Sequence, residues 1–234
     1  MSIARFASWV HKWLALLVGV QILFWVASGL FFTLYPIEQI RSENLIHKVS
    51  PRALDIAAIG SLETMRDASG RPPIKLAIEQ RDMGQVIVAE FADGPPALFD
   101  AASMKALSPV DAQTATRIAR GHVTVKSAPT SVTRIEAETP EYRGALPAWR
   151  LQFREGGLAV YVAVNTGAVT ARRSDLWRLY DTLWALHIMD WRDHENFNHP
   201  LIIITAALTL ISTIAGIVLL PFRIRFRRRA ERGA

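Results

Sequence analysis

The uncharged run "WLALLVGVQILFWVASGLFFTLY", residues 13–35, decides the fold class of this 234-residue chain. It holds 23 residues without a charge, and a second uncharged run covers residues 201–222. A helix of about 20 apolar residues crosses a hydrocarbon core of roughly 30 Å. The two runs therefore predict transmembrane helices at residues 13–35 and 200–222, with about 165 residues between them.

The distribution of charge predicts the orientation of these spans. Arg5 and Lys12 precede the first run, and residues 223–234 hold six arginines beside Glu231. Loops on the cytoplasmic side of a membrane carry an excess of Lys and Arg. The sequence thus predicts an inner-membrane protein of a bacterium, with residues 1–12 and the basic tail in the cytoplasm and the central segment in the periplasm. The bulky end of the first run favours an uncleaved anchor over a signal peptide.

Composition excludes several classes of protein. The net charge is +6 with no cysteine, and the basic excess lies mainly in the tail, where it acts first as a topology determinant and an anionic-lipid contact. We therefore expect no nucleic acid among the partners, and the lipid bilayer as the first of them. Without cysteine, disulfides, iron–sulfur ligation and attachment of c-type haem are excluded. No Walker, GxGxxG, HExxH or GxSxG motif is present.

The central segment contains a repeated pattern. Residues 48–60, "KVSPRALDIAAIG", and 106–121, "ALSPVDAQTATRIARG", share Ser-Pro, an acid, and Ala or Ile at helical spacing. Ser50 and Ser108 suit helix N-caps followed by proline at the first helical position, and Asp111 fits a capping box. Strand-like runs follow each predicted helix, at 73–80, 85–92 and 96–107 and then at 148–155, 158–165 and 167–173.

These patterns predict an α+β extracytoplasmic domain made of two tandem modules, residues 36–107 and 108–175, each a helix plus antiparallel strands. A single irregular domain is the alternative. Alternation in the second module places Trp149, Leu151 and Phe153 on one face of a strand. "EGG" at 155–157 and "NTG" at 165–167 predict hairpin turns.

The second module resembles the PepSY family. The stretch "YRGALPAWRLQFREGGLAVYVAVNTGAVTARR", residues 142–173, has the Trp-Arg pair that opens a strand and the Thr-Gly turn of PepSY modules. Residues 11–29 and 178–203 are similar to PepSY-associated transmembrane helices, so the resemblance covers almost the whole chain. Some four-span relatives resemble inner-membrane ferric-siderophore reductases, which bind b-type haem through histidines of their helices. Two spans are half of such a scaffold, which implies a homodimer or a partner membrane protein.

Two histidines are the main candidates for ligands. His11 begins a stripe of small residues on the first span, where helices approach closely, although an aromatic and basic belt at the interface is also a sound reading. His187 lies on an aromatic stripe with Tyr180, Trp184 and Trp191 in a predicted amphipathic interfacial helix and collar, residues 176–199. The resemblance implies that His11 and His187 are ligands of haem iron, and His199 is a further cofactor-binding candidate.

His194 and His199 have a plainer reading. They lie in the polar sequence "RDHENFNHP" and fit a solvated collar, with His199 or Asn198 as the cap of the second span. A zinc site made of His187, His194, Glu195 and His199 is an alternative, but a zinc site needs three or four ligands in fixed geometry, and this spacing matches no known motif.

The resemblance therefore implies a haem b-binding redox subunit that assists iron or ferric-siderophore reduction, a possible oxidoreductase with a ferric siderophore as a possible partner. His11 and His199 lie at opposite ends of the predicted spans, so one haem cannot bridge them. The alternative is a membrane-tethered PepSY module that binds a peptide or protease and carries no cofactor.

Overall fold

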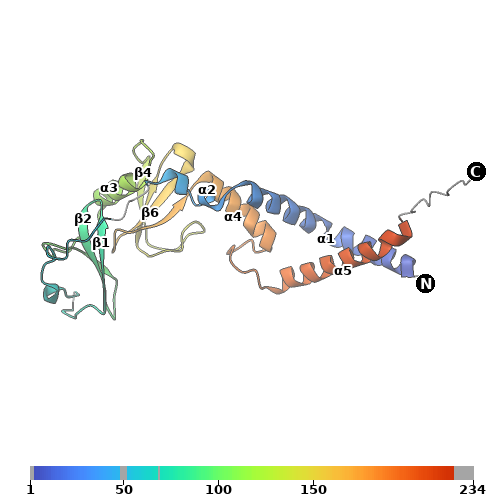
Figure 1. Ribbon diagram of the computed structural model, residues 1–234, viewed down its shortest axis with the longest axis horizontal. Helices are drawn as coiled ribbons and strands as arrows, with labels where there is room; N and C mark the ends of the chain where they lie inside the picture. Colours follow the sequence, from blue (N-terminus) through green and yellow to red (C-terminus); the bar gives the residue numbers. More distant parts are fainter. Residues whose placement is uncertain (1–2, 48–51, 68, 224–234) are drawn as a thin grey trace, which may run out of the picture. The chain divides into compact units, whose positions relative to one another are not determined.

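The computed structural model describes residues 3–47, 52–67 and 69–223 (Figure 1). The chain divides into two compact units. A helical unit holds Met1–Pro36 and Leu179–Ala234, and an α+β unit holds Ile37–Arg178. Helix α4, Asp175–Ile188, crosses the boundary between them.

The helical unit contains the two predicted spans. Helix α1 covers Ile3–Leu34 and helix α5 covers Pro200–Arg223. Both are long and apolar enough to cross a membrane. Helix α5 agrees with the predicted span, whereas α1 starts at Ile3 rather than at the first residue of the uncharged run. Arg5 and Lys12 do not interrupt it because arginine and lysine are good helix formers.

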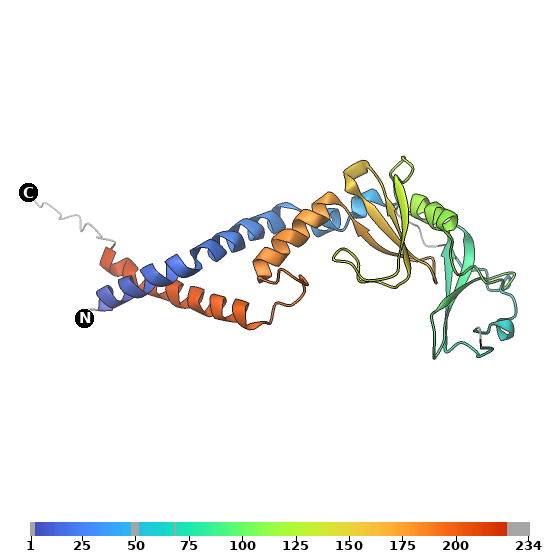
Figure 2. The same ribbon diagram turned by 180° about the vertical axis from the view of Figure 1, so that it is seen from behind.

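Helix α1 pairs with two different helices along its length. Its 32 residues give it a length of about 48 Å. Figures 1 and 2 show α5 running beside its N-terminal part and the last turns of α4 beside its C-terminal part. Contacts agree with the pictures, since His11 touches α5 while Phe32 packs against Tyr180 of α4.

Small and polar residues form the seam between α1 and α5. Thr205, Ser212 and Ala215 are buried on α5, so small residues of this helix face α1. Short side chains let the two backbones approach closely. On α1, by contrast, Gly19 and Gly29 have open space where a side chain would begin. These two glycines of the stripe predicted for α1 therefore meet no close neighbour at their Cβ positions, whereas its first member, His11, contacts α5.

The α+β unit is built on two antiparallel sheets, which confirms the predicted fold class. The first sheet has the order β1-β2-β3 and the second the order β4-β5-β6-β7. Strand β4 was not expected from the sequence. The bounds of the elements are α2 Ile37–Ile40, β1 Lys75–Arg81, β2 Gly84–Glu90, β3 Ala97–Asp100, α3 Ala112–His122, β4 Ser131–Ile135, β5 Ala148–Gln152, β6 Ala159–Ala163 and β7 Val169–Arg173.

One hydrophobic core joins both sheets. Leu151, Phe153 and Val160 of the second sheet are fully buried against Ala115 and Ala119 of α3. The predicted alternation is confirmed, because Trp149 packs against the same core. The first sheet adds its own buried side chains to this cluster, Val86 and Leu98. The two predicted modules therefore share one core within this unit.

The predicted helix at residues 48–60 is wrong for the part that the structure describes. Ser50 lies outside the described residues, and residues 52–60 contain no helix. The Asp55 carboxylate accepts the backbone N–H groups of Ala57 and Ala58, at 3.1 and 3.2 Å. Such local bonds from an aspartate favour a turn over a helix.

The second predicted helix is present, but its cap is a different residue. Helix α3 begins at Ala112, and the Asp111 carboxylate accepts the N–H of Thr114 at 2.7 Å. Ser108 instead accepts the N–H of Leu98 through its hydroxyl at 3.0 Å. Aspartate caps a helix as well as serine does, so Ser108 can extend the contacts of β3. The predicted turn at 165–167 is confirmed, with Gly167 at φ +61° between β6 and β7.

An ion pair fixes the first turn of α4 to the second sheet. Arg178 donates through Nε to Glu141 Oε1 at 2.6 Å and through Nη1 to the Gly157 carbonyl oxygen at 2.8 Å. The Tyr161 hydroxyl donates to Glu141 Oε2 at 3.0 Å. The bond from Arg178, followed by the bond from Tyr161, holds the pKa of Glu141 below its ordinary value of 4.5, against the effect of burial. The ionised carboxylate is thus the form that the fold stabilises.

Replacing Glu141 with Gln should make the stability of the α+β unit less sensitive to acid. Because the pKa of Glu141 is lowered on folding, its charge stabilises the fold above pH 4.5 and this contribution is lost as the pH falls further. We expect E141Q to lower the melting temperature most at neutral pH, with the difference from the native chain shrinking below pH 4.5. Intrinsic tryptophan fluorescence of the full chain in detergent measures both curves.

The matched control is Glu63→Gln, because Glu63 is exposed and has no hydrogen bond or ion pair among the described residues. This variant should follow the native curve at every pH. A difference between E141Q and the native chain that stays constant with pH would contradict the prediction.

Candidate functional site

His187 is anchored through Nδ1 to the first span. Its Nδ1 lies 2.7 Å from the Ser28 hydroxyl oxygen. When Ser28 donates its proton to the Phe24 carbonyl oxygen, at 2.6 Å, it accepts from Nδ1, and the lone pair of the ring is then on Nε2. Nε2 has no hydrogen-bond partner within the described part of the chain.

Aromatic rings pack around His187. The ring of Trp184 is stacked on it, with centroids 6.2 Å apart and planes at 4°, and Tyr180 stacks on Trp184 in turn. The centroid of the Phe32 ring, on α1, lies 5.7 Å from the centroid of the His187 ring. The predicted aromatic stripe is confirmed for Tyr180, Trp184 and His187. Trp191 is not part of it, because α4 ends at Ile188 and the Trp191 side chain is 59% exposed.

The last carbonyl groups of α4 accept hydrogen bonds from side chains of α1 and from His199, the residue before α5. A helix leaves its final carbonyls without partners inside the helix. Here Gln21 of α1 donates to the Leu186 oxygen at 2.9 Å and Trp25 Nε1 donates to the His187 oxygen at 2.6 Å. His199, which precedes α5, donates through Nε2 to the Ile188 oxygen at 3.0 Å. Three side chains thus satisfy three consecutive carbonyls, and they fix the position of His187.

His11 is also anchored through Nδ1, at the other end of α1. Its Nδ1 donates to the Ser212 carbonyl oxygen of α5 at 2.8 Å. The ring fills the notch left by Gly216, where a Cβ atom would come within 3.0 Å of His11 Cε1. Nε2 has no hydrogen-bond partner in residues 3–47, 52–67 and 69–223. His11 and His187 thus share an anchored Nδ1 and an unpartnered Nε2.

The other two histidines of the predicted collar fold back onto α4. His194 Nδ1 lies 2.6 Å from Asp181 Oδ2, and His199 uses Nε2 to cap α4, which leaves only Nδ1 for any ligand. Neither side chain is a purely solvated collar residue. Within the described residues, no three His, Asp or Glu side chains form a group that could hold a metal ion. The alternative zinc site with Glu195 is therefore not assembled.

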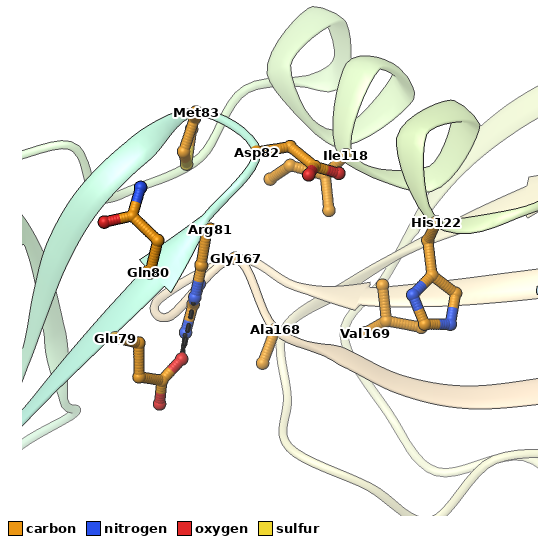
Figure 3. A pocket seen from close by; sticks show the side chains of 10 residues that line it. All are labelled: Glu79, Gln80, Arg81, Asp82, Met83, Ile118, His122, Gly167, Ala168 and Val169. Carbon is orange, nitrogen blue, oxygen red and sulfur yellow. Dashed lines mark hydrogen bonds and ion pairs between the residues drawn. The ribbon is translucent and has the colours of Figure 1, made fainter. Parts of the chain in front are cut away.

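The α+β unit has a cavity of its own. It measures about 280 Å³ and lies between the β1–β2 turn, α3 and the start of β7 (Figure 3). Arg81, which is paired with Glu79 at 2.8 Å, donates to the Thr166 carbonyl oxygen at 2.6 Å and forms one wall. Asp82 lies on the turn above, and apolar Ile118 and Val169 complete the lining. The sequence patterns did not indicate this cavity, because its lining residues come from both predicted modules of the α+β unit.

His122 lies at one side of this cavity and is neutral. Arg172 Nη1 lies 2.9 Å from His122 Nε2 and can only donate, so Nε2 is the acceptor and Nδ1 carries the proton. Burial first, and then the nearby charge of Arg172, lower the pKa of His122 below 6.5. The guanidinium of Arg172 thus satisfies the acceptor nitrogen of His122.

The fold and these contacts define a membrane-anchored α+β protein. Two helices that can cross a membrane flank the α+β unit, and each holds or contacts a histidine with a free Nε2. The family model of the PepSY-associated transmembrane region matches residues 8–234, so the chain belongs to the PepSY-associated transmembrane family. No curated protein and no solved structure matches the chain.

Replacing Gly216 with Val should disrupt the seam at His11. The Cβ would press on the imidazole ring, and overpacking of this kind costs about 1–3 kcal/mol. We expect a lower melting temperature of the full chain in detergent, followed by tryptophan fluorescence. Gly19→Val is the matched control, because Gly19 has open space at its Cβ. Equal melting temperatures of the two variants would show that the notch is not required.

Replacing Gln21 with Leu should release the end of α4. The Leu186 carbonyl would lose its donor, and a buried unsatisfied group costs about 1–3 kcal/mol. We expect faster hydrogen exchange in peptides from α4, measured by mass spectrometry. Val20→Leu, at a position that is 66% exposed, adds a similar apolar side chain and should leave exchange unchanged. Exchange in Q21L that matches this control would contradict the capping role.

Proposed function

We propose that the chain is a haem b-binding redox subunit of the bacterial inner membrane that assists the reduction of iron or a ferric siderophore. The observation that supports it is the shared state of His11 and His187. A histidine that binds a metal commonly donates its second ring N–H to a fixed oxygen acceptor, which orients the ring and raises the basicity of the ligating nitrogen. Both histidines have this arrangement, with Nε2 as the ligating atom.

The two histidines belong to two different sites. His11 and Ser28, the partner of His187, are 17 residues apart on α1, which is about 26 Å along a helix. One haem macrocycle therefore cannot contact both His11 and His187. Each chain would therefore supply one ligand nitrogen, from His11 or from His187, to each of the two sites, whereas His199 has only Nδ1 available because its Nε2 donates to α4.

The chain can supply ligand nitrogens to haem. The described residues of one chain do not form a pocket that encloses the macrocycle. The His11 ring is packed into the Gly216 notch, and aromatic rings cover His187. We therefore propose a homodimer, in which the same histidine of a second copy, or one from a partner membrane protein, completes each ligand pair. When bound, haem supplies one-electron transfer. The chain itself positions the ligand nitrogens, and the absence of flavin and nicotinamide motifs assigns the electron supply to another protein.

An absorption spectrum tests this proposal directly. Protein expressed with ample haem should show a Soret band that shifts on reduction. With one haem at each site, H11A and H187A should each remove about half of the band, because each variant removes the ligands of a single site. Cross-linking in membranes should trap a species of twice the mass of one chain.

His47→Ala is the matched control, because His47 is exposed in the α+β unit and should leave the Soret band intact. Full bands in both H11A and H187A would reject these histidines as ligands. A native chain without a Soret band in either redox state would reject haem binding altogether.

The cavity beside His122 supports a second candidate function. A membrane-tethered module that binds a peptide, a protease or another ligand would need a site in the α+β unit, and this cavity of about 280 Å³ is a concave surface with mixed polar and apolar lining. In that case the spans serve only as anchors. Retained activity in a cell after both spans are replaced by an unrelated anchor favours this module over the redox subunit.

A further inference from the structure

A second cavity lies between the start of α1 and the end of α5, and neither His11 nor His187 is among its lining residues. It measures about 440 Å³. Its polar lining comes from one face of α1, where Arg5, Ser8 and Lys12 are spaced three and four residues apart. Its apolar and aromatic lining comes from Trp9, Leu219 and Phe222. The cavity is therefore cationic on one side and apolar on the other.

The positive charge in this cavity has no partner of opposite sign in the described helices. No Asp or Glu occurs in residues 3–37 or 196–223. The Lys12 ammonium lies 5.5 Å from the Trp13 ring, a contact that leaves its charge intact. The tail beyond α5, residues 224–234, is outside the described residues, and it carries five arginines against Glu231. Neutralisation must therefore come mainly from outside the chain.

We propose that this cavity binds one anionic phospholipid, with the phosphodiester against Arg5 and Lys12 and the acyl chains along Leu219 and Phe222. The cavity lies at the terminal turns of both apolar helices, where a lipid headgroup meets its tails. The Ser8 hydroxyl provides a donor between the two cations. Basic pockets between transmembrane helices suit acidic headgroups, and Trp9 is of the amphipathic type that favours this depth.

Native mass spectrometry of the full chain in detergent tests the site. The probes are phosphatidylglycerol and phosphatidylcholine with identical acyl chains. Each basic residue near an anionic surface contributes roughly a fivefold factor in binding, about 25-fold for two residues. We expect the native chain to retain phosphatidylglycerol in clear preference to phosphatidylcholine, and the variant R5Q/K12Q to lose most of that preference.

The control variant R52Q/K105Q removes the same charge from exposed positions of the α+β unit and should bind as the native chain does. Ser8→Phe keeps the charge but fills the cavity, so it should also reduce retention. Equal retention of the two lipids by the native chain, or undiminished preference in folded R5Q/K12Q, would overturn the proposal. Displacement of the lipid by soluble glycerol phosphate would show a free-phosphate site instead and overturn the assignment to lipid.

Discussion

The unpaired carbonyl groups at the end of α4 are the constraint on which the helical unit depends. Helix α4 stops beside α1, its last backbone oxygens have no partner inside the helix, and an unsatisfied buried carbonyl costs free energy. Gln21 and Trp25 of α1 and His199 before α5 supply the three donors. These bonds tie the three helices together at one level, and the position of His187 follows from them.

This arrangement also explains why α1 is longer than one membrane crossing. Its N-terminal part forms a seam with α5, in which Ser212 and Gly216 accommodate His11. Its C-terminal part packs against the aromatic stripe of α4. Helix α1 thus contributes to two packing environments. Each contains a histidine whose Nδ1 lies against an oxygen atom and whose Nε2 has no hydrogen-bond partner in the described residues. The proposal of two haem sites depends on this common state, since a histidine that donates through Nδ1 can bind a metal through Nε2.

Much of the fold could be predicted because its signals are local. The uncharged runs, the alternation through Leu151 and Phe153, and the turn at Gly167 are each set within a few residues of sequence. The wrong predictions concern side chains that could form hydrogen bonds with either of two partners. Ser108 has the features of a helix cap, but it bonds to Leu98, and Asp111 caps α3 instead. Asp55 has the features of a helical residue, but it closes a turn of its own.

The sequence by itself determined that the chain has two membrane-crossing helices, an α+β segment between them and His11 and His187 as the leading candidates. These conclusions rest on hydropathy, period and motif, which need no knowledge of distant contacts. Only the tertiary structure decided the anchoring of the two histidines through Nδ1, the cap on α4, the single core shared by both sheets and the cationic cavity at Arg5 and Lys12. Each of these joins residues far apart in the chain, and their pairing follows from packing geometry that local sequence does not encode.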